Sequence, residues 1–406
     1  MSDRPPVTDR PPVTDWAADF DHMDARWVED PFPIWDDLRQ RCPVAHTTRY
    51  GGVYLPTRMA DVRDVAYDPE TFSNRRPVVR ANPPDVPLPT PPISSDPPHH
   101  KPSRMLLLPA FTPQAIAPYI PVTRRICAEL LDQIGDARSC DAAVQYAQHV
   151  PVRVIAAMLG VPETDGDLFR RWIQISLDDT IHDTPESAAT FVAVSREMDA
   201  YFKRHVESKI DSKGTDLISF MMRARFDGRE LTERHFYGAL RLLLIAGIDT
   251  TWSTIGAALW HLAKTPDDRR RLVAEPALMT TAVEEFLRAY APVTMARQVR
   301  KDGEIAGCPV KAGEMVLLAL PAANRDPAAF PDADRVIIDR QDNRHAAFGL
   351  GIHRCVGSNL ARMEIQVALE EWLKRFPEFT LETTKPVTWA AGQVRGPRTV
   401  PVRIGA

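Results

Sequence analysis

Residues 346–364 read AAFGLGIHRCVGSNLARME, with Cys355 set between glycines and just ahead of a helix-like run. Glycine permits positive φ and lets the backbone approach another body closely. Free N–H groups at the start of a helix stabilise negative charge, so this spacing predicts a lowered pKa and a thiolate at Cys355. Thiolates bind soft or borderline metals, haem iron included. A flat macrocycle against the turn would explain the missing side chains at Gly349, Gly351 and Gly357. The alternative is a buried structural cysteine beside a glycine turn.

A long helix is expected from Thr232 to Lys264, and at ~1.5 Å per residue it would span roughly 50 Å. Its middle reads AGIDTT, residues 246–251, which is a poor choice for the centre of a buried helix. Gly247 removes bulk, so that a ligand can lie against the backbone, and Thr250 can hydrogen-bond to the carbonyl one turn earlier. Asp249 can relay protons from outside. The alternative is an ordinary polar face with a tolerated glycine.

Composition and charge exclude several classes of protein. The chain has 406 residues, 44% hydrophobic and 26% charged, which is ordinary for a soluble enzyme with a large core. Its net charge of −4 argues against general affinity for nucleic acid or anionic membranes. The longest apolar run near a helix centre, Leu242 to Ile248, is too short to span a bilayer. Five scattered cysteines argue against disulfide scaffolds and zinc sites, and favour a reducing cytoplasm.

The secondary-structure signals along the chain predict a mainly α fold with a minor β part. Residues 1–15, MSDRPPVTDRPPVTD, predict a disordered proline-rich tail, and residues 16–406 a single catalytic domain. A hairpin and short helix are expected over 47–66, and nine prolines make 76–98 a long loop. The spacing of apolar residues is mostly helical over 100–290, and residues 303–320 are expected to form short strands. A further helix is expected from Cys355 to about Phe376, followed by strands and turns over 378–404.

The spacing of Phe348, Gly351, Cys355 and Gly357, F-x-x-G-x-x-x-C-x-G, resembles the haem-binding signature of the cytochrome P-450 superfamily. The resemblance spans about residues 28–404, and its motifs occur in the family's order. It implies the P-450 fold, with a long central helix over the haem and the cysteine loop beneath. It also implies that Cys355 is the proximal ligand of a haem b iron.

Further residues take roles from the same resemblance. Asp249 and Thr250 match the acid–alcohol pair that delivers protons for O2 activation, with Ala246 and Gly247 in the groove over the haem. Glu285 and Arg288 match the E-x-x-R motif, whose structural role is to hold the cysteine loop. Its downstream partner is expected to be Arg335, although Val336 replaces the usual aromatic residue. On spacing alone, Glu285 and Arg288 would be a surface helix pair.

Four side chains match the family's haem-propionate partners: His100 and Arg104, one helical turn apart, together with Arg297 and His353. Arginine forms strong charge-assisted hydrogen bonds to carboxylates. The alternative for His100 and Arg104 is a solvated basic face.

Family position also predicts the walls of an apolar substrate pocket. They include the loop near Pro91–Ile93 and the helix around 172–180. The individual residues are Ile93, Leu243, Leu244, Val293, Thr294, Met295, Ala296, Gln393 and Val394.

The resemblance implies an O2-dependent monooxygenase acting on a small hydrophobic substrate, aromatic compounds included, by hydroxylation or O-dealkylation. Electrons from NAD(P)H would arrive through a ferredoxin or a flavin/iron–sulfur reductase, with Arg354 and Arg362 contributing to a basic docking surface. Parts of the sequence look like haem domains of self-sufficient enzymes that carry such a reductase. We expect a cytoplasmic monomer without nucleic-acid or membrane partners. The alternatives are a haem-thiolate peroxygenase or isomerase, and a non-catalytic haem sensor.

Overall fold

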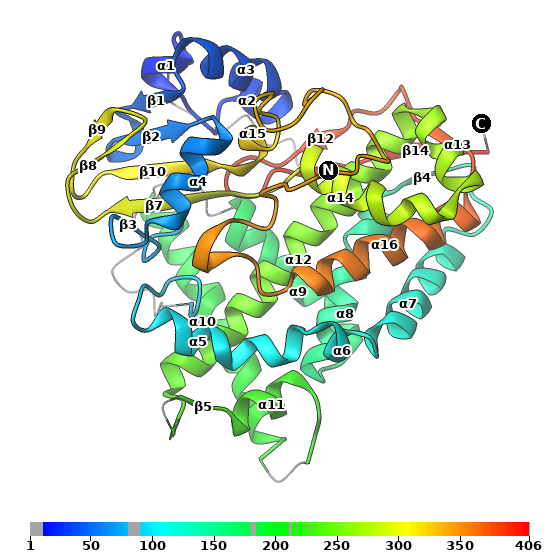
Figure 1. Ribbon diagram of the computed structural model, residues 1–406. Helices are drawn as coiled ribbons and strands as arrows, with labels where there is room; N and C mark the ends of the chain where they lie inside the picture. Colours follow the sequence, from blue (N-terminus) through cyan, green and yellow to red (C-terminus); the bar gives the residue numbers. More distant parts are fainter. Residues whose placement is uncertain (1–10, 80–89, 180–183, 211–212, 227, 406) are drawn as a thin grey trace.

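Helices make up most of the fold, and a smaller β part lies to one side of them (Figure 1). The computed structural model describes residues 11–79, 90–179, 184–210, 213–226 and 228–405. Helices before residue 160 are α1 (Trp16–Asp19), α2 (Ala25–Glu29), α3 (Phe32–Arg41), α4 (Met59–Tyr67), α5 (His100–Leu107), α6 (Pro113–Ile116), α7 (Tyr119–Ile134) and α8 (Val150–Leu159). After it come α9 (Gly166–Gln174), α10 (Pro185–Glu207), α11 (Leu217–Arg223), α12 (Glu233–Lys264), α13 (Pro266–Ala274), α14 (Met279–Ala289), α15 (Leu320–Ala323) and α16 (Ser358–Arg375). The predicted mainly α class is confirmed.

The largest sheet has the strand order β1-β2-β10-β7-β3. Its strands are β1 (Val44–Thr47), β2 (Val53–Pro56), β3 (Phe72–Ser73), β7 (Thr294–Val299) and β10 (Met315–Ala319). Only the β2–β10 pair of this sheet is parallel. The predicted hairpin is β1–β2, followed by α4, and the predicted short strands are β8 (Gly303–Ile305), β9 (Cys308–Val310) and β10. The carboxyl-terminal strands are β11 (Phe379–Leu381), β12 (Thr388–Trp389), β13 (Pro397–Thr399) and β14 (Pro401–Ile404), and β4 (Ser139–Asp141) pairs with β14. One further small hairpin joins β5 (Arg225–Phe226) to β6 (Arg229–Glu230).

Helix α12 passes through the middle of the helical part (Figure 1). The side chain of Thr232 caps its first turn by accepting a hydrogen bond from the His235 N–H, as expected of a threonine N-cap. Among the described helices, α12 alone is long and apolar enough to cross a membrane, and 72% of its most apolar window is buried inside the protein. Burial on most of its surface makes α12 a core helix.

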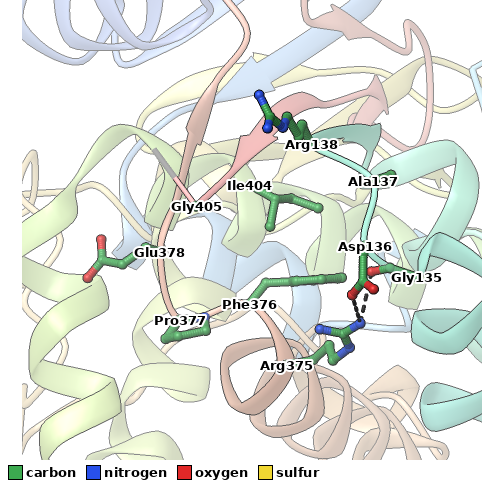
Figure 2. A pocket seen from close by; sticks show the side chains of 10 residues that line it. All are labelled: Gly135, Asp136, Ala137, Arg138, Arg375, Phe376, Pro377, Glu378, Ile404 and Gly405. Carbon is green, nitrogen blue, oxygen red and sulfur yellow. Dashed lines mark hydrogen bonds and ion pairs between the residues drawn. The ribbon is translucent and has the colours of Figure 1, made fainter.

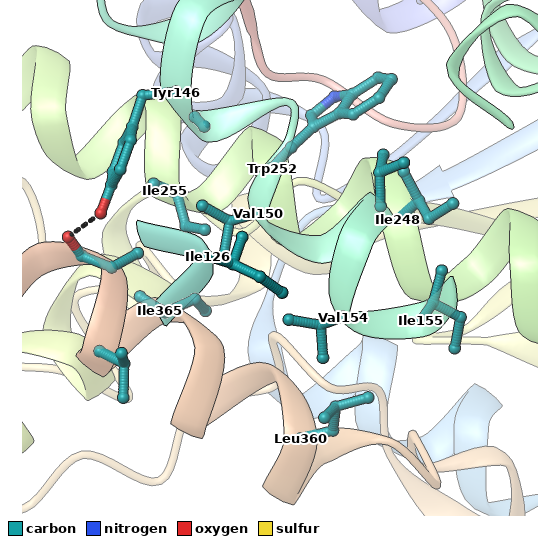
Figure 3. Packing of buried hydrophobic residues seen from close by; sticks show 14 of the residues in the cluster. Ile126, Tyr146, Val150, Val154, Ile155, Ile248, Trp252, Ile255, Leu360 and Ile365 are labelled. Atoms are coloured by element: carbon teal, nitrogen blue, oxygen red, sulfur yellow. Dashed lines mark hydrogen bonds between the residues drawn. The ribbon is translucent and has the colours of Figure 1, made fainter. Parts of the chain in front are cut away.

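Helices α7, α8, α12 and α16 share one hydrophobic core (Figure 3). The side chains drawn there include Ile248, Trp252 and Ile255 of α12, with Val150 and Val154 of α8 facing them. Burying each large aliphatic side chain contributes about 1.5–3 kcal/mol. Tyr146 is also in this core, and its hydroxyl donates to the Ala368 carbonyl of α16 at 2.7 Å. The core therefore holds α16, and the cysteine loop before it, in a fixed position beside α12.

The amino-terminal segment contradicts part of the predicted tail. Residues 1–10 lie outside the described part of the chain, but residues 11–15 are attached to the protein. Val13 is buried, and its carbonyl accepts a hydrogen bond from Arg26 at 2.7 Å. Arg49 donates to the Pro11 carbonyl at 2.9 Å. The apolar valine within the polar repeat supplies buried surface that the composition argument overlooked.

The proline-rich loop contains no helix or strand in its described parts, 76–79 and 90–98, as predicted. The buried Asp96 anchors it by accepting hydrogen bonds from the Ser73 hydroxyl at 2.6 Å and the Asn74 N–H at 2.9 Å. Because Asp96 lies four residues before His100, this anchor places the start of α5 near strand β3.

Candidate functional site

The cysteine loop is a tight turn closed by its own backbone. The Cys355 N–H donates to the Phe348 carbonyl at 2.7 Å. Gly349 and Gly351 have φ values of 73° and 65°, a region that favours glycine. A Cβ on Gly351 would lie 2.3 Å from the Ala66 carbonyl oxygen of α4. The expectation that a macrocycle explains the missing side chain is therefore wrong at Gly351, where the backbone of α4 does so.

The Cys355 thiol does not have the lowered pKa that the sequence predicts. Burial, the largest effect, raises its pKa, while the Gly357 N–H and the Arg104 and Arg354 guanidinium groups oppose that rise. The helix begins only at Ser358, three residues further on, which weakens its influence on the sulfur. Cys355 keeps accessible surface even though protein surrounds it densely, so a second body can reach the sulfur.

Four basic side chains gather near this cysteine, as the sequence predicts. His100 and His353 have ring centroids 4.4 Å apart. Burial lowers the pKa of Arg297 to about 10 and that of Arg104 below its ordinary value. Burial also lowers the pKa of His353 to about 2, with Arg297, His100 and Arg104 adding repulsion. Burial and Arg104 lower the pKa of His100 in the same way. The two guanidinium groups therefore supply the positive charge of the cluster, and the two imidazoles contribute little to it near neutral pH.

Within the described residues, none of these four side chains forms an ion pair with a carboxylate. The Nε2 atoms of His100 and His353 are buried and have no hydrogen-bond partner among the described residues. In the part of the chain that the structure describes, Arg297 donates only to the adjacent Ala296 carbonyl, at 2.8 Å. Buried donors without acceptors are costly in a folded protein. These residues therefore fit a ligand that carries two carboxylates, and with the accessible sulfur of Cys355 they fit an iron porphyrin.

The middle of α12 places Ala246, Gly247 and Thr250 on one side of the helix. Thr250 donates to the Ala246 carbonyl at 2.9 Å, the i−4 hydrogen bond that the sequence predicts. Ala246 is exposed although it lies in the centre of a core helix. A Cβ on Gly247 would meet only Ile155, at an ordinary 3.7 Å, so packing within the protein does not require glycine there. This side of α12 can accept a flat ligand against its backbone.

Asp249 faces a different way from Thr250. Its carboxylate is fully buried and pairs with Arg398 of β13, whose two terminal nitrogens lie 2.7 and 3.2 Å from the two carboxylate oxygens. The Ser253 hydroxyl is 3.4 Å from the same carboxylate. Arg398 is a partner that the sequence analysis missed, because it lies 149 residues further along the chain.

Glu285 and Arg288 form a fully buried ion pair at 2.8 Å, not a surface pair. Arg288 also donates to the carbonyls of Asn324, Ala333 and Arg335, at 2.9, 2.8 and 2.6 Å. The prediction that the Arg335 side chain is the third member of this network is wrong. That side chain is exposed, and Arg335 contributes only its backbone carbonyl.

Arg340 fills the position that was assigned to Arg335. Its Nε lies 3.0 Å from the Glu285 carboxylate, and Asn343 donates to the same carboxylate at 3.1 Å. The loop repeats the dipeptide Asp-Arg at 334–335 and 339–340, so the sequence offered two candidates and no means of choosing between them.

Arg362 is not free to serve a docking surface. It pairs with Glu284 of α14 through two hydrogen bonds of 2.5 and 2.8 Å, and its guanidinium lies 4.4 Å from the centre of the Phe348 ring. His345 contacts the same carboxylate at 3.1 Å. Arg354 is exposed, and the described part of the protein gives it no ion pair. Of the two predicted docking residues, only Arg354 presents its charge to solvent.

Some predicted pocket residues do line a cavity. Thr294 and Gln393 border one with Ser176 and Leu177, which lie in the predicted 172–180 segment, and with Met23. Two predictions are wrong, since Leu244 lies fully buried in the main core and Ala296 in the cluster under α1–α3. Ile93, Leu243, Val293, Met295 and Val394 are buried or half-buried. Gln393 donates to the Met295 sulfur at 3.0 Å, and Val293 bridges Val394, so these residues hold one wall together.

A second cavity lies away from all predicted site residues (Figure 2). It is a surface crevice of about 290 Å³ between the end of α7 and the end of α16. Arg375 closes one side by donating to the Asp136 carboxylate at 2.9 Å. Its remaining lining includes Phe376 and Ile404. It contains none of the groups described around Cys355.

Comparisons with known proteins agree with this geometry. Residues 167–395 match the family model of cytochrome P450. The chain is 35% identical to the probable cytochrome P450 127A1 of Sinorhizobium fredii, over 84% of this chain and 81% of that protein. It is 34% identical to the vitamin D(3) 25-hydroxylase of Pseudonocardia autotrophica, over 95% of this chain and 96% of that protein. The crystal structure of CYP109E1 from Bacillus megaterium in complex with testosterone superposes with a TM-score of 0.86 at 32% identity, over 93% of this chain and 98% of that one. This chain therefore belongs to the cytochrome P450 family.

Proposed function

We propose that this P450 monooxygenase binds haem b with Cys355 as the axial ligand, and that it oxygenates small hydrophobic compounds, aromatic ones included, by hydroxylation or O-dealkylation. The observation that carries the proposal is the basic cluster of His100, Arg104, Arg297 and His353, which has no carboxylate partner among the described residues and lies beside an accessible thiol. Two propionates would supply the missing acceptors.

The protein's own residues have three tasks in this reaction. Haem, when bound, supplies the reductive activation of O2. The Gly357 N–H and nearby arginines stabilise negative charge on the Cys355 sulfur, which sets how strongly that ligand donates. The Thr250 hydroxyl, which already donates to Ala246, keeps its lone pairs available to accept and pass on a proton. Asp249 acts as the acid that supplies this proton from the protein side.

The electron donor is proposed to be a ferredoxin or a flavin/iron–sulfur reductase, fed by NAD(P)H. P450 monooxygenases need such a partner, and the exposed Arg354 next to the cysteine offers a positive charge to an acidic protein. We place the enzyme in the cytoplasm as a monomer, in keeping with five free cysteines and the burial of its one long apolar helix.

The proposed substrate class follows from the cavity beside Thr294. Most of its lining is apolar, including Met23, Val79 and Leu177, and Thr294 and Gln393 add polar groups. Relatives carry names that refer to vitamin D3 and to mycinamicin IV, and a similar structure holds testosterone. We infer a substrate with an apolar body and at least one hydrogen-bonding group.

The first test replaces the ligand. In the Cys355→Ser variant we expect the thiolate-type CO spectrum of the reduced protein to disappear. The Cys308→Ser variant, a change on β9 away from the site, should keep it. A wild-type spectrum in Cys355→Ser would end the assignment of the ligand.

The second test concerns protons and substrate. Thr250→Ala should raise the peroxide released per NADH, whereas Thr250→Ser, which keeps the hydroxyl, should stay near wild type. Unchanged coupling in Thr250→Ala would remove its relay role. The ligand class is tested by spectral titration with anisole, testosterone and glucose, and binding of glucose alone would contradict an apolar pocket.

A further inference from the structure

The face of α12 that carries Asp249 is covered by the strand β13. Residues three, four and seven positions after Asp249 lie on this same helix face. A Cβ on Gly396 would lie 2.2 Å from both the Cβ and the Oγ of Ser253, and a Cβ on Gly256 would lie 3.0 Å from Pro397. Gly396 and Gly256 thus let the backbone at the start of β13 approach α12 closely. This contact places Arg398, the residue after Pro397, directly over the Asp249 carboxylate.

The Arg398 guanidinium is held on more than one side. It pairs with both carboxylate oxygens of Asp249, at 2.7 and 3.2 Å, and approaches the Ser253 hydroxyl at 3.5 Å. Its central carbon lies 5.4 Å from the centre of the Trp252 ring, within the range of a cation–π contact. The Asp249 side chain is 0% exposed and that of Arg398 18% exposed. Arg398 therefore stands between the buried acid and solvent.

A relay acid must be stable in both of its protonation states. A carboxylate that is fully buried without a cation is strongly disfavoured, and such a group keeps its proton. Removing one partner of a buried ion pair leaves this uncompensated charge. A buried acid that cannot tolerate its anion is a poor proton donor, because each donation would create that anion.

We propose that Arg398 is the positioning residue for proton delivery, because it stabilises the carboxylate that remains each time Asp249 gives up a proton. The inference rests on the proposed relay role of Asp249. In the step, the O–H bond of the Asp249 carboxylic acid breaks and a new O–H bond forms on a water bonded to the Thr250 hydroxyl, or on that hydroxyl itself, while the receiving group releases its own proton toward the substrate side of α12. Water at the exposed edge of Arg398 then returns a proton to the carboxylate. No electrons move in this exchange.

The test uses haem-loaded protein and four variants: Arg398→Gln, Arg398→Lys, Asp249→Asn and the double variant Arg398→Gln/Asp249→Asn. Arg403→Gln is the matched control, since Arg403 lies on the neighbouring strand and its pair with Glu382 is on the surface. The first readout is the infrared band of a protonated carboxyl group. The second is the peroxide released per NADH, measured with anisole or testosterone, whichever shifts the visible spectrum more. The third is the solvent isotope effect on product formation.

In Arg398→Gln we expect, beside the band of the buried Glu364, an additional protonated-carboxyl band that wild type, Arg403→Gln and the double variant lack. Product formation should fall by about tenfold or more, toward the roughly 10²–10⁴-fold typical of a positioned proton donor, with a larger solvent isotope effect. Arg398→Lys keeps a cation and should recover a good part of the coupling. If Arg398→Gln does not fold, the lysine variant decides, because its single charge should give an intermediate peroxide yield.

Three results overturn the inference, and they show which part of it fails. If Asp249→Asn releases more peroxide but Arg398→Gln shows neither the band nor a coupling change, the role of Arg398 fails and the relay stands. If Asp249→Asn itself leaves coupling unchanged, the relay role of Asp249 fails and takes this inference with it. A wild-type peroxide yield in Arg398→Lys together with Arg398→Gln would also refute the need for a cation.

Discussion

Replacing Arg288 by methionine tests the buried network that supports the cysteine loop. The change leaves the carbonyls of Asn324, Ala333 and Arg335 without their donor and removes the closest cation from Glu285. Asn324 matters most for the site, since its side chain accepts from the Ala346 N–H at 2.6 Å, where the cysteine loop begins. Loss of Arg288 should therefore affect both stability and haem retention.

The magnitude follows from the burial of the pair. Both side chains are 0% exposed, and removing one partner of such a pair costs about 3–5 kcal/mol. An unfolding entropy of about 2.1 cal/mol/K per residue gives about 0.85 kcal/mol/K for 406 residues. The midpoint of thermal unfolding should thus fall by about 4–6 °C in Arg288→Met.

Two other arginines serve as graded controls. Arg340→Met removes hydrogen bonds to Glu285 and to the carbonyls of Pro331 and Asp332. The charged hydrogen bond to Glu285, about 1.5–3 kcal/mol, alone should lower the midpoint by about 2–3.5 °C. Arg335→Met changes an exposed side chain that makes no contact with Glu285, so its effect should stay within about 0.5 kcal/mol. The assay is thermal unfolding of the haem-loaded protein, followed together with the CO spectrum. An Arg335→Met midpoint as low as that of Arg340→Met would refute this account of the network.

Two predictions concern pH. Burial alone would raise the pKa of Glu284, but Arg362 and His345 lower it to about 2, so its contribution to stability is fully present above pH 4.5 and is lost as pH falls from 4.5 toward 2. Wild type and Glu284→Gln should differ in urea midpoint at pH 6 and converge near pH 2, and a constant difference would contradict the ion pair. Burial raises the pKa of Glu364 well above its ordinary value, and neither of its carboxyl oxygens has a hydrogen-bond partner among the described residues. Above pH 4.5 the unfolded chain has therefore lost this proton while the folded protein keeps it, so folding must bind a proton and stability falls as pH rises. Glu364→Gln should therefore be more stable than wild type at pH 8 and equal to it near pH 4, and the reverse order would show that the folded protein holds a carboxylate.

The parts of the fold that follow local rules could be predicted from sequence. The long helix begins at Thr232 because a threonine there caps the next turn, and its apolar character marks it as a core element. The Thr250 hydrogen bond to Ala246 is equally local, since it spans one helical turn. The cysteine motif can be recognised for a related reason, because its members lie within ten residues of one another, and the haem site that it predicts remains a proposal.

The errors arise where partners are distant in sequence. Nothing near Gly351 in the chain indicates that the Ala66 carbonyl will lie against it. The choice between Arg335 and Arg340 depends on how the loop after β10 returns to α14, a tertiary property. The pKa of Cys355 was mispredicted because burial outweighs the helix terminus, and burial is not visible in a local pattern.

Three long-range ion pairs share one arrangement around the site. Glu285 with Arg340, Glu284 with Arg362 and Asp249 with Arg398 join residues 55, 78 and 149 positions apart. Each places an acid of α12 or α14 against an arginine from a later segment. Glu285 and Asp249 are fully buried, whereas Glu284 and Arg362 are partly exposed. Intact pairs contribute little net stability compared with apolar packing, since desolvation or solvent screening offsets their attraction, although removing one partner of a buried pair is costly.

Their geometric demand, by contrast, is strict. Arg362 with Glu284 and Arg398 with Asp249 each form two hydrogen bonds, for which the guanidinium and the carboxylate must meet in one plane, and Arg340 directs its Nε at Glu285. The hydrophobic core around α12 can tolerate small shifts of neighbouring helices, but these pairs cannot. We therefore attribute the stability of the site to the apolar core and its shape to the three pairs. Substitutions in the pairs should accordingly change the haem environment or the proton supply as well as lower the melting temperature, whereas core substitutions should chiefly lower the melting temperature.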